Sequence, residues 1–175
     1  MAQETSSSLL KLYMILGKRL ALLLIFIICA NVIGYALYLQ LVINLLPCPL
    51  CIAQRIAYWL IGLTALFYFI HYPQNLCQKI YSIFMVIFSL LGLLLALHHS
   101  WLIAYSENFE CGISAEEEFI NNILIAKWWP IMFEANGDCA DIEWEFIFLT
   151  IPNWSAIFFL VFSIFSVYIL FANNN

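Results

Sequence analysis

Charged residues are scarce in this sequence of 175 residues. Lysine and arginine together number 6 and aspartate and glutamate 11, so charged residues make up 10% of the chain, whereas 65% is hydrophobic. A soluble domain is about one quarter charged and about half apolar. The composition therefore excludes an ordinary water-soluble domain.

Four long segments contain no charged residue. These segments cover residues 20–54, 56–78, 80–106 and everything after Glu145. A helix needs ~20 apolar residues to cross the ~30 Å hydrocarbon core of a bilayer. We therefore predict four transmembrane helices, over residues 20–46, 52–70, 80–103 and 152–171.

The apolar runs also exclude two other membrane-associated structures. They are apolar on all sides, whereas the strands of a membrane barrel alternate between apolar and polar residues. The first run is longer than the apolar core of a cleaved signal peptide. With no internal repeat in the chain, the expected fold is an all-α integral membrane protein, a four-transmembrane-helix up-and-down bundle in a single domain over residues 1–175.

Basic residues near the helix ends predict the orientation. Three of the six lysine and arginine residues precede the first predicted helix, and Lys79 lies between the second and the third. Because such residues concentrate on the cytoplasmic side, both termini are expected in the cytoplasm. The short connection 47–51 and the long loop 104–146 then face the periplasm of a bacterium, with the helices in its inner membrane.

The long loop is strongly acidic. It contains ten acidic residues against Lys127 alone, a net charge of -9 that leaves +4 on the rest of the chain. This distribution argues against nucleic-acid binding and against a polybasic lipid-binding face in the cytoplasm.

A short amphipathic helix is predicted within this loop. Ser114 and Glu117 fit a capping box, and apolar residues recur at helical spacing from Phe119 to Trp128. Such a helix either lies along the outer membrane surface, where indole rings are favoured, or packs on the protein.

Six cysteines divide between the two sides of the predicted membrane. Cys29 lies inside the first helix and Cys77 on the cytoplasmic side, so both are expected to be inert. The four outer cysteines are Cys48, Cys51, Cys111 and Cys139. In an oxidising compartment four thiols can form two disulfides, in any of three pairings.

The CxxC motif of Cys48 and Cys51 predicts redox chemistry, because a disulfide that closes so small a loop stabilises a fold little. Pro49 suits the first turn of a helix, which puts Cys48 at the N-cap and Cys51 in the first turn. Backbone N–H groups and the helix dipole stabilise a thiolate there. Arg55, one turn further on, would stabilise that thiolate or hold an anion, unless it only anchors the helix end at the interface.

Two structural alternatives apply to the outer cysteines. Four thiolates could bind zinc, but Cys111 and Cys139 are separated by 28 positions without a second CxxC, and no histidine of the loop completes a ligand set. No metal is therefore expected. Taken alone, the pair Cys111 and Cys139 could also form a purely structural disulfide.

Three segments together resemble the disulfide bond formation protein B (DsbB) family, the quinone reductases of the bacterial inner membrane. They are PCPLCI at 47–52 followed by Arg55, GDCA at 137–140 followed by Trp144 and Phe146, and PNWS at 152–155. The resemblance covers most of the chain.

This resemblance implies an electron relay. A periplasmic thioredoxin-like dithiol protein of the DsbA type would form a mixed disulfide with Cys111, and Cys139 would resolve it. The pair Cys48 and Cys51 would then reoxidise the loop dithiol, and Cys51 would pass the electrons to ubiquinone or menaquinone. Arg55 matches the arginine that lies near the quinone in this family. His99 matches a histidine of the same site, with His98 as the alternative.

Two further protein classes share a four-helix plan. A tetraspan scaffold with purely structural outer-loop disulfides leaves the CxxC motif and Arg55 unexplained, and its Cys-Cys-Gly signature is missing. Relatives of vitamin K epoxide reductase carry their CxxC late in the bundle, unlike Cys48. The loop between Cys111 and Cys139 differs from that of the better-known DsbB proteins. DsbI-like relatives share the same cysteine plan and serve different partners, so the sequence leaves the dithiol partner of this chain open.

Overall fold

The computed structural model describes residues 2–71, 76–105, 115–137, 139, 145–146 and 148–172. This part of the chain is almost entirely helical. Its elements are α1 (Ala2–Val42), α2 (Pro49–His71), α3 (Leu76–Ala104), α4 (Ala115–Asn122), α5 (Leu124–Trp128), α6 (Pro130–Phe133), β1 (Glu145–Phe146), β2 (Leu149–Thr150) and α7 (Ile151–Ala172).

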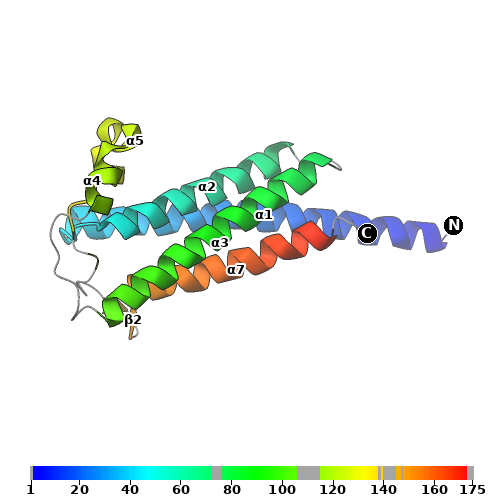
Figure 1. Ribbon diagram of the computed structural model, residues 1–175. Helices are drawn as coiled ribbons and strands as arrows, with labels where there is room; N and C mark the ends of the chain where they lie inside the picture. Colours follow the sequence, from blue (N-terminus) through cyan, green and yellow to red (C-terminus); the bar gives the residue numbers. More distant parts are fainter. Residues whose placement is uncertain are drawn as a thin grey trace.

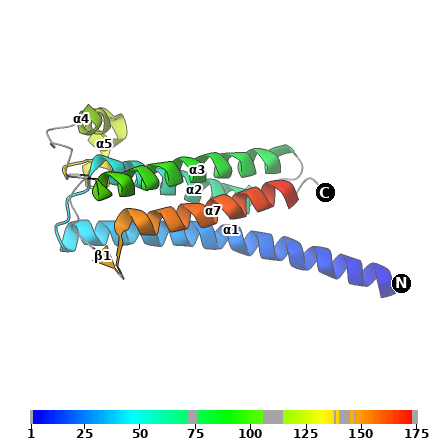
Figure 2. The same ribbon diagram turned by 60° about the horizontal axis from the view of Figure 1, so that its bottom comes forward.

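Four helices are long and apolar enough to cross a membrane: the Gly17–Val42 part of α1, then α2, α3 and the Ile151–Phe171 part of α7. Successive long helices run in opposite directions, both chain ends lie at one end of the bundle, and α4 and α5 lie at the other (Figures 1 and 2). The predicted all-α, four-helix membrane fold is confirmed.

The helix that contains the first membrane span begins and ends earlier in the chain than the predicted range 20–46. It ends at Val42, whereas the apolar run continues to residue 46. Asn44 adopts the left-handed conformation with a φ of 60°, which asparagine tolerates better than most residues. The N–H of Leu45 then donates to the carbonyl of Leu39 at 3.3 Å, which turns the chain out of the helix.

Helices α2 and α3 connect the four membrane helices into one bundle. Helix α2 contacts α1 and α3, and α3 contacts α7. The buried face of α3 repeats every three or four residues and is mostly small: Ser82, Met85, Ser89, Gly92, Ala96 and His99. At Gly92 a Cβ atom would lie 2.5 Å from the ring of Phe159, so glycine permits the close approach of α3 and α7.

The predicted amphipathic segment forms two helices rather than one. Ile123 has extended backbone angles, φ -64° and ψ 137°, which separate α4 from α5. The side chain of Asn121 bonds both the N–H and the carbonyl of Ala135, each at 2.9 Å, so α4 is tied to the chain that follows α6. Ile120 and Ile123 line a groove against α2 and α3, whereas Trp128 is 90% exposed. Ser114 of the expected capping box lies outside the described residues.

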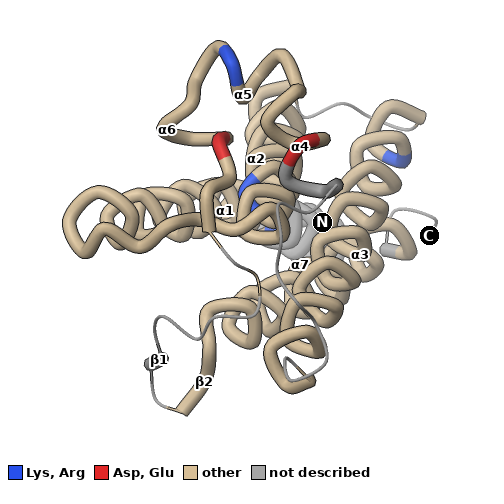
Figure 3. The backbone as a smooth tube through the Cα atoms, turned by 60° about the vertical axis from the view of Figure 1, so that its left-hand side comes forward, with Lys and Arg blue, Asp and Glu red and all other residues tan. Residues whose placement is uncertain are grey.

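A two-stranded hairpin leads into the last helix. Strands β1 and β2 pair antiparallel, with Glu145 opposite Thr150 and Phe146 opposite Leu149. Charged residues are concentrated outside the long helices. Figure 3 shows that these helices are almost free of charged residues and that the acidic residues drawn there lie in the segment from α4 to just after α6.

Candidate redox site

The CxxC motif caps the N-terminus of α2. Cys48 precedes the first helical residue, Pro49, and its sulfur accepts the backbone N–H of Cys51 at 3.2 Å. The N–H of Ile52 donates to the carbonyl of Cys48 at 3.1 Å, which is the first bond of the helix. The predicted places of Cys48 at the N-cap and Cys51 in the first turn are confirmed.

The two sulfurs of the motif face each other. Cys48 Sγ and Cys51 Sγ are 3.1 Å apart, about 1 Å more than the length of an S–S bond. Cys48 is buried and Cys51 partly exposed. A small rotation of either side chain therefore brings the sulfurs to bonding distance without a change in the backbone, so that removal of two electrons and two protons by an acceptor closes the disulfide.

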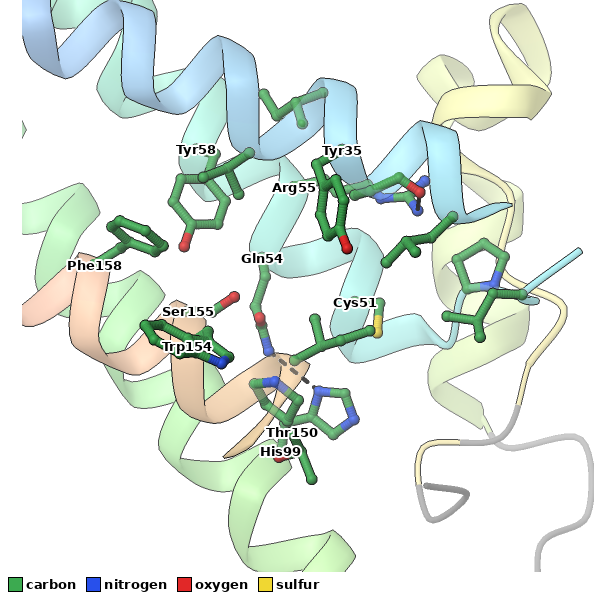
Figure 4. A pocket seen from close by; sticks show the side chains of 18 of the residues that line it. Tyr35, Cys51, Gln54, Arg55, Tyr58, His99, Thr150, Trp154, Ser155 and Phe158 are labelled. Carbon is green, nitrogen blue, oxygen red and sulfur yellow. Dashed lines mark hydrogen bonds between the residues drawn. The ribbon is translucent and has the colours of Figure 1, made fainter. Parts of the chain in front are cut away.

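His99, near the end of α3, reaches the same place. Its Nε2 lies 3.7 Å from Cys48 Sγ, and both residues are buried. On the other side of the ring, the amide nitrogen of Gln54 lies 3.2 Å from Nδ1 (Figure 4). With the Gln54 amide donating to Nδ1, the ring proton is on Nε2, the nitrogen that faces the Cys48 sulfur. His98 is exposed and stacks on Trp101, away from this cluster.

The loop that carries Cys139 folds back onto the start of α2. The N–H groups of Asn136 and Gly137 both donate to the carbonyl of Pro47, at 3.0 and 3.1 Å. Gly137 packs against the carbonyl of Leu46 so closely that no Cβ atom fits there. These contacts place Cys139 beside the CxxC motif.

Three side chains that are far apart in the sequence thus meet. Cys48 Sγ, Cys139 Sγ and a ring nitrogen of His99 all lie within 4.8 Å of one another. Hydrogen bonds of the Cys48 thiol with Cys139 and Cys51, together with burial, hold the pKa of Cys48 far above its usual range. These contacts therefore disfavour loss of the proton from the Cys48 thiol in the reduced state.

Arg55 is buried between α1, α2 and α6. Its guanidinium donates to Gln40 Oε1 at 2.7 Å, to the carbonyl of Met132 at 3.3 Å and to that of Ala36 at 3.5 Å. These acceptors are neutral, and in the described part of the chain no carboxylate lies within 4 Å of the guanidinium. Its positive charge is therefore available to an anion or to a polarised oxygen nearby.

A cavity of about 730 Å³ joins these residues. Its lining is mostly apolar and comes from α1, α2, α3, β2 and α7. Residues at its wall include Cys51, Arg55, Tyr58, His99, Trp154 and Phe158. In Figure 4 the Tyr58 hydroxyl points towards Ser155, and the Gln54 amide points towards His99. The size and lining are typical of a site for a largely apolar small molecule.

Comparisons with known proteins identify the family of this chain. The family model of disulfide bond formation protein DsbB matches residues 18–169. The disulfide bond formation protein B of Nitrosospira multiformis is 58% identical over 157 residues, which cover 90% of this chain and 94% of that protein. The protein of the same name from Nitrosomonas eutropha is 60% identical over 146 residues, which cover 83% and 90%. That of Aromatoleum aromaticum is 35% identical over 144 residues, which cover 82% and 86%. This chain belongs to the DsbB family.

Membership of the DsbB family makes the protein a membrane oxidoreductase of disulfide bond formation, rather than a tetraspan scaffold. Of the cysteines assigned to chemistry, the structure brings together Cys48, Cys51 and Cys139, while Cys111 lies outside the described residues. Cys29 and Cys77 are remote from the cluster. Cys29 is buried beside Gly62 in the middle of the bundle, and Cys77 is exposed near the start of α3.

Two polar contacts of this DsbB site have no counterpart in the sequence-based prediction. Gln54 orients His99, and Gln40 accepts the shortest hydrogen bond of Arg55. The sequence did contain one signal for these contacts. Both glutamines lie within predicted membrane helices, where a polar amide side chain needs a hydrogen-bond partner. Their partners could not be named, because those partners lie on other helices.

Proposed function

We propose that this DsbB protein reoxidises a periplasmic thioredoxin-like dithiol protein of the DsbA type and passes the electrons to ubiquinone or menaquinone in the bacterial inner membrane. The observation that carries the proposal is the placement of a CxxC pair, with sulfurs 3.1 Å apart, at the wall of a largely apolar cavity between membrane helices. A quinone is a largely apolar molecule of the membrane, and a neighbouring thiol pair is its electron donor.

The relay begins at the loop cysteines. A thiolate of the partner attacks the Cys111–Cys139 disulfide, forms a mixed disulfide with Cys111 and releases Cys139 as a thiolate. The second thiol of the partner then displaces Cys111, so that the partner leaves oxidised and the loop pair is reduced. One disulfide has broken and one has formed, with two electrons transferred to the loop.

The second exchange takes place at the helix end. The proximity of Cys139 to Cys48 supports attack by the Cys139 thiolate on Cys48 Sγ, with Cys51 as the leaving thiolate. The Cys111 thiol then closes the loop disulfide and leaves Cys48 and Cys51 as a dithiol. Cys51 is the less buried of the two thiols and lines the cavity, so it is the one placed to pass the electrons on.

The last step transfers two electrons and two protons from the dithiol to quinone, which gives quinol and the Cys48–Cys51 disulfide. Arg55 at the cavity wall can stabilise the oxygen that becomes negative, and His99 can orient the quinone or hold the proton shared with Cys48. Thr150 adds a buried hydroxyl to the cavity that has no hydrogen-bond partner within the described residues.

Charge supports the orientation in which these cysteines are periplasmic. Arg19, which follows Lys18, donates to the carbonyl of Phe69 near the end of α2, whereas the CxxC motif lies at the start of that helix. Both chain ends lie at the end of the bundle away from α4 and α5 (Figure 1). Because lysine and arginine mark the cytoplasmic side, both termini face the cytoplasm.

Quinone reduction by the purified protein tests the proposal. The full chain in detergent is mixed with a reduced thioredoxin-like dithiol protein, and quinone absorbance is followed with ubiquinone and with menaquinone analogues. We expect turnover in the wild type, none in Cys51→Ser, and unchanged turnover in Cys77→Ser, which alters an exposed cysteine near the start of α3. A folded wild-type protein that reduces neither quinone with any such donor would refute the proposal.

A further inference from the structure

The geometry points to a redox-gated metal site: we infer that the reduced protein binds a thiophilic divalent cation such as Zn²⁺ through Cys48 Sγ, Cys139 Sγ and His99 Nε2. The inference goes beyond electron transfer to quinone, because it concerns a ligand of the dithiol state and needs neither quinone nor partner.

The distances between the donor atoms suit zinc. A tetrahedral site with Zn–S of ~2.3 Å and Zn–N of ~2.0 Å places a sulfur and a nitrogen ligand ~3.5 Å apart and two sulfurs ~3.8 Å apart. Cys48 Sγ and His99 Nε2 are 3.7 Å apart, and the three donor atoms all lie within 4.8 Å of one another. Movements of about 1 Å or less therefore complete the three-ligand set.

The chemistry of the donors selects the class of metal. Two thiolates and an imidazole are soft to intermediate ligands, which favour zinc and its heavier congener cadmium over magnesium or calcium. Cys51 is a further thiol within reach of the fourth position, since its sulfur lies 3.1 Å from that of Cys48. The cluster also has an outer partner: Gln54 faces His99 Nδ1 at 3.2 Å. Ligation by Nε2 requires the ring proton on Nδ1, and a half-turn of the Gln54 amide lets its oxygen accept a hydrogen bond from Nδ1–H.

The spacing of the cysteines disfavours zinc only when the nitrogen ligand is sought within the loop. His99 belongs to a membrane helix, 51 residues beyond Cys48, and the fold supplies it as the nitrogen ligand. Burial adds to the argument, because Cys48 and His99 are each less than 5% exposed and little water competes for the cation.

The oxidation state gates the site. Each thiol that becomes a ligand releases its proton to solvent, and no electron is transferred. A disulfide between Cys48 and Cys51, or one that includes Cys139, removes a thiolate from the set. The bound cation in turn occupies the sulfurs needed for exchange, so zinc is expected to hold the enzyme in its reduced, inactive state.

The test uses full-length protein in detergent, without quinone or partner, and with Cd²⁺ as the probe. Titration of the reduced protein should give ultraviolet thiolate-to-cadmium absorption that saturates at one ion per chain, and Zn²⁺ should displace the cadmium. The oxidised protein should show no such absorption. Cys48→Ser and Cys139→Ser should each abolish the site, and Gln54→Ala should lower the affinity about 10–100-fold through loss of the outer partner. Cys77→Ser is the matched control and should bind as the wild type does.

Two outcomes would overturn the inference. One is a reduced, folded wild-type protein that binds no cadmium. The other is binding that survives Cys48→Ser and Cys139→Ser but is lost in Cys77→Ser, which would place the metal at the exposed thiol. Circular dichroism of each variant confirms that its helices are intact. Neither outcome bears on quinone reduction, which is measured separately on protein free of metal.

Discussion

Replacement of Gly92 by alanine tests how closely α3 and α7 approach. The new methyl group would lie 2.5, 2.6 and 2.8 Å from three ring atoms of Phe159, whereas carbon atoms in contact are ~3.5–4.0 Å apart. The ring would have to retreat by about 1 Å, but Phe159 is fully buried and stacks on Tyr58 with centroids 4.3 Å apart. We expect a loss of about 1–3 kcal/mol of unfolding free energy, the usual cost of overpacking.

The matched control is Gly34→Ala, the same chemical change in α1. Nothing lies within 4 Å of a Cβ atom at this position, so the variant should be neutral or stabilised by up to ~1 kcal/mol through helix propensity. Unfolding in detergent is followed by circular dichroism against denaturant. In a Phe159→Val background, which removes the ring, Gly92→Ala should lose most of its cost. Equal stability of Gly92→Ala and Gly34→Ala would refute the reasoning.

Three other predictions concern the redox site. Arg55→His should raise the KM for quinone about 10–100-fold, which corresponds to the loss of one hydrogen bond from a charged donor. Thiol exchange with the dithiol partner should be retained. Steady-state kinetics at varied quinone concentration test this, and a fall in kcat with an unchanged KM would contradict it. Gly137→Ala should push the Cys139 loop away from the Leu46 carbonyl and slow thiol–disulfide exchange between Cys139 and Cys48. Rapid-quench alkylation measures the rate of this exchange, and a wild-type rate would contradict the prediction. Hydrogen bonding to Cys139 raises the pKa of Cys48, so iodoacetamide should modify Cys48 of the reduced protein faster as the pH rises. Cys139→Ala should shift this dependence of the alkylation rate on pH to lower pH. Mass spectrometry at each pH measures the rate, and the same dependence in both proteins would contradict the prediction.

The sequence predicted the membrane helices well because their signal is local. Each run without charge is long enough to span a bilayer, and no neighbouring segment is needed to recognise it. The end of the first helix was placed too late, at residue 46 rather than Val42, because hydropathy does not register the left-handed turn at Asn44. The same limit applies to the loop, where Ile123 interrupts a continuous apolar period.

At the redox site, too, features that depend on adjacent residues could be predicted, whereas contacts between distant residues could not. The helix start at Pro49 and the capping role of Cys48 follow from adjacent residues, and the structure confirms both. The hydrogen bonds of Arg55 could not be foreseen, since the Met132 carbonyl lies 77 residues away and depends on how the loop returns to the bundle.

Hydropathy and helix capping act over a few residues, and they are enough to predict a four-helix membrane protein with a CxxC motif at a helix start. The meeting of Cys139 and His99 with Cys48, and the contact of Gln54 with the histidine, follow only from the folded arrangement of the chain. Those contacts depend on the packing of α2 against α3 and on the backbone hydrogen bonds that hold the loop against Pro47. Both join segments that are distant in the chain, where spacing along the sequence carries no information about distance in space.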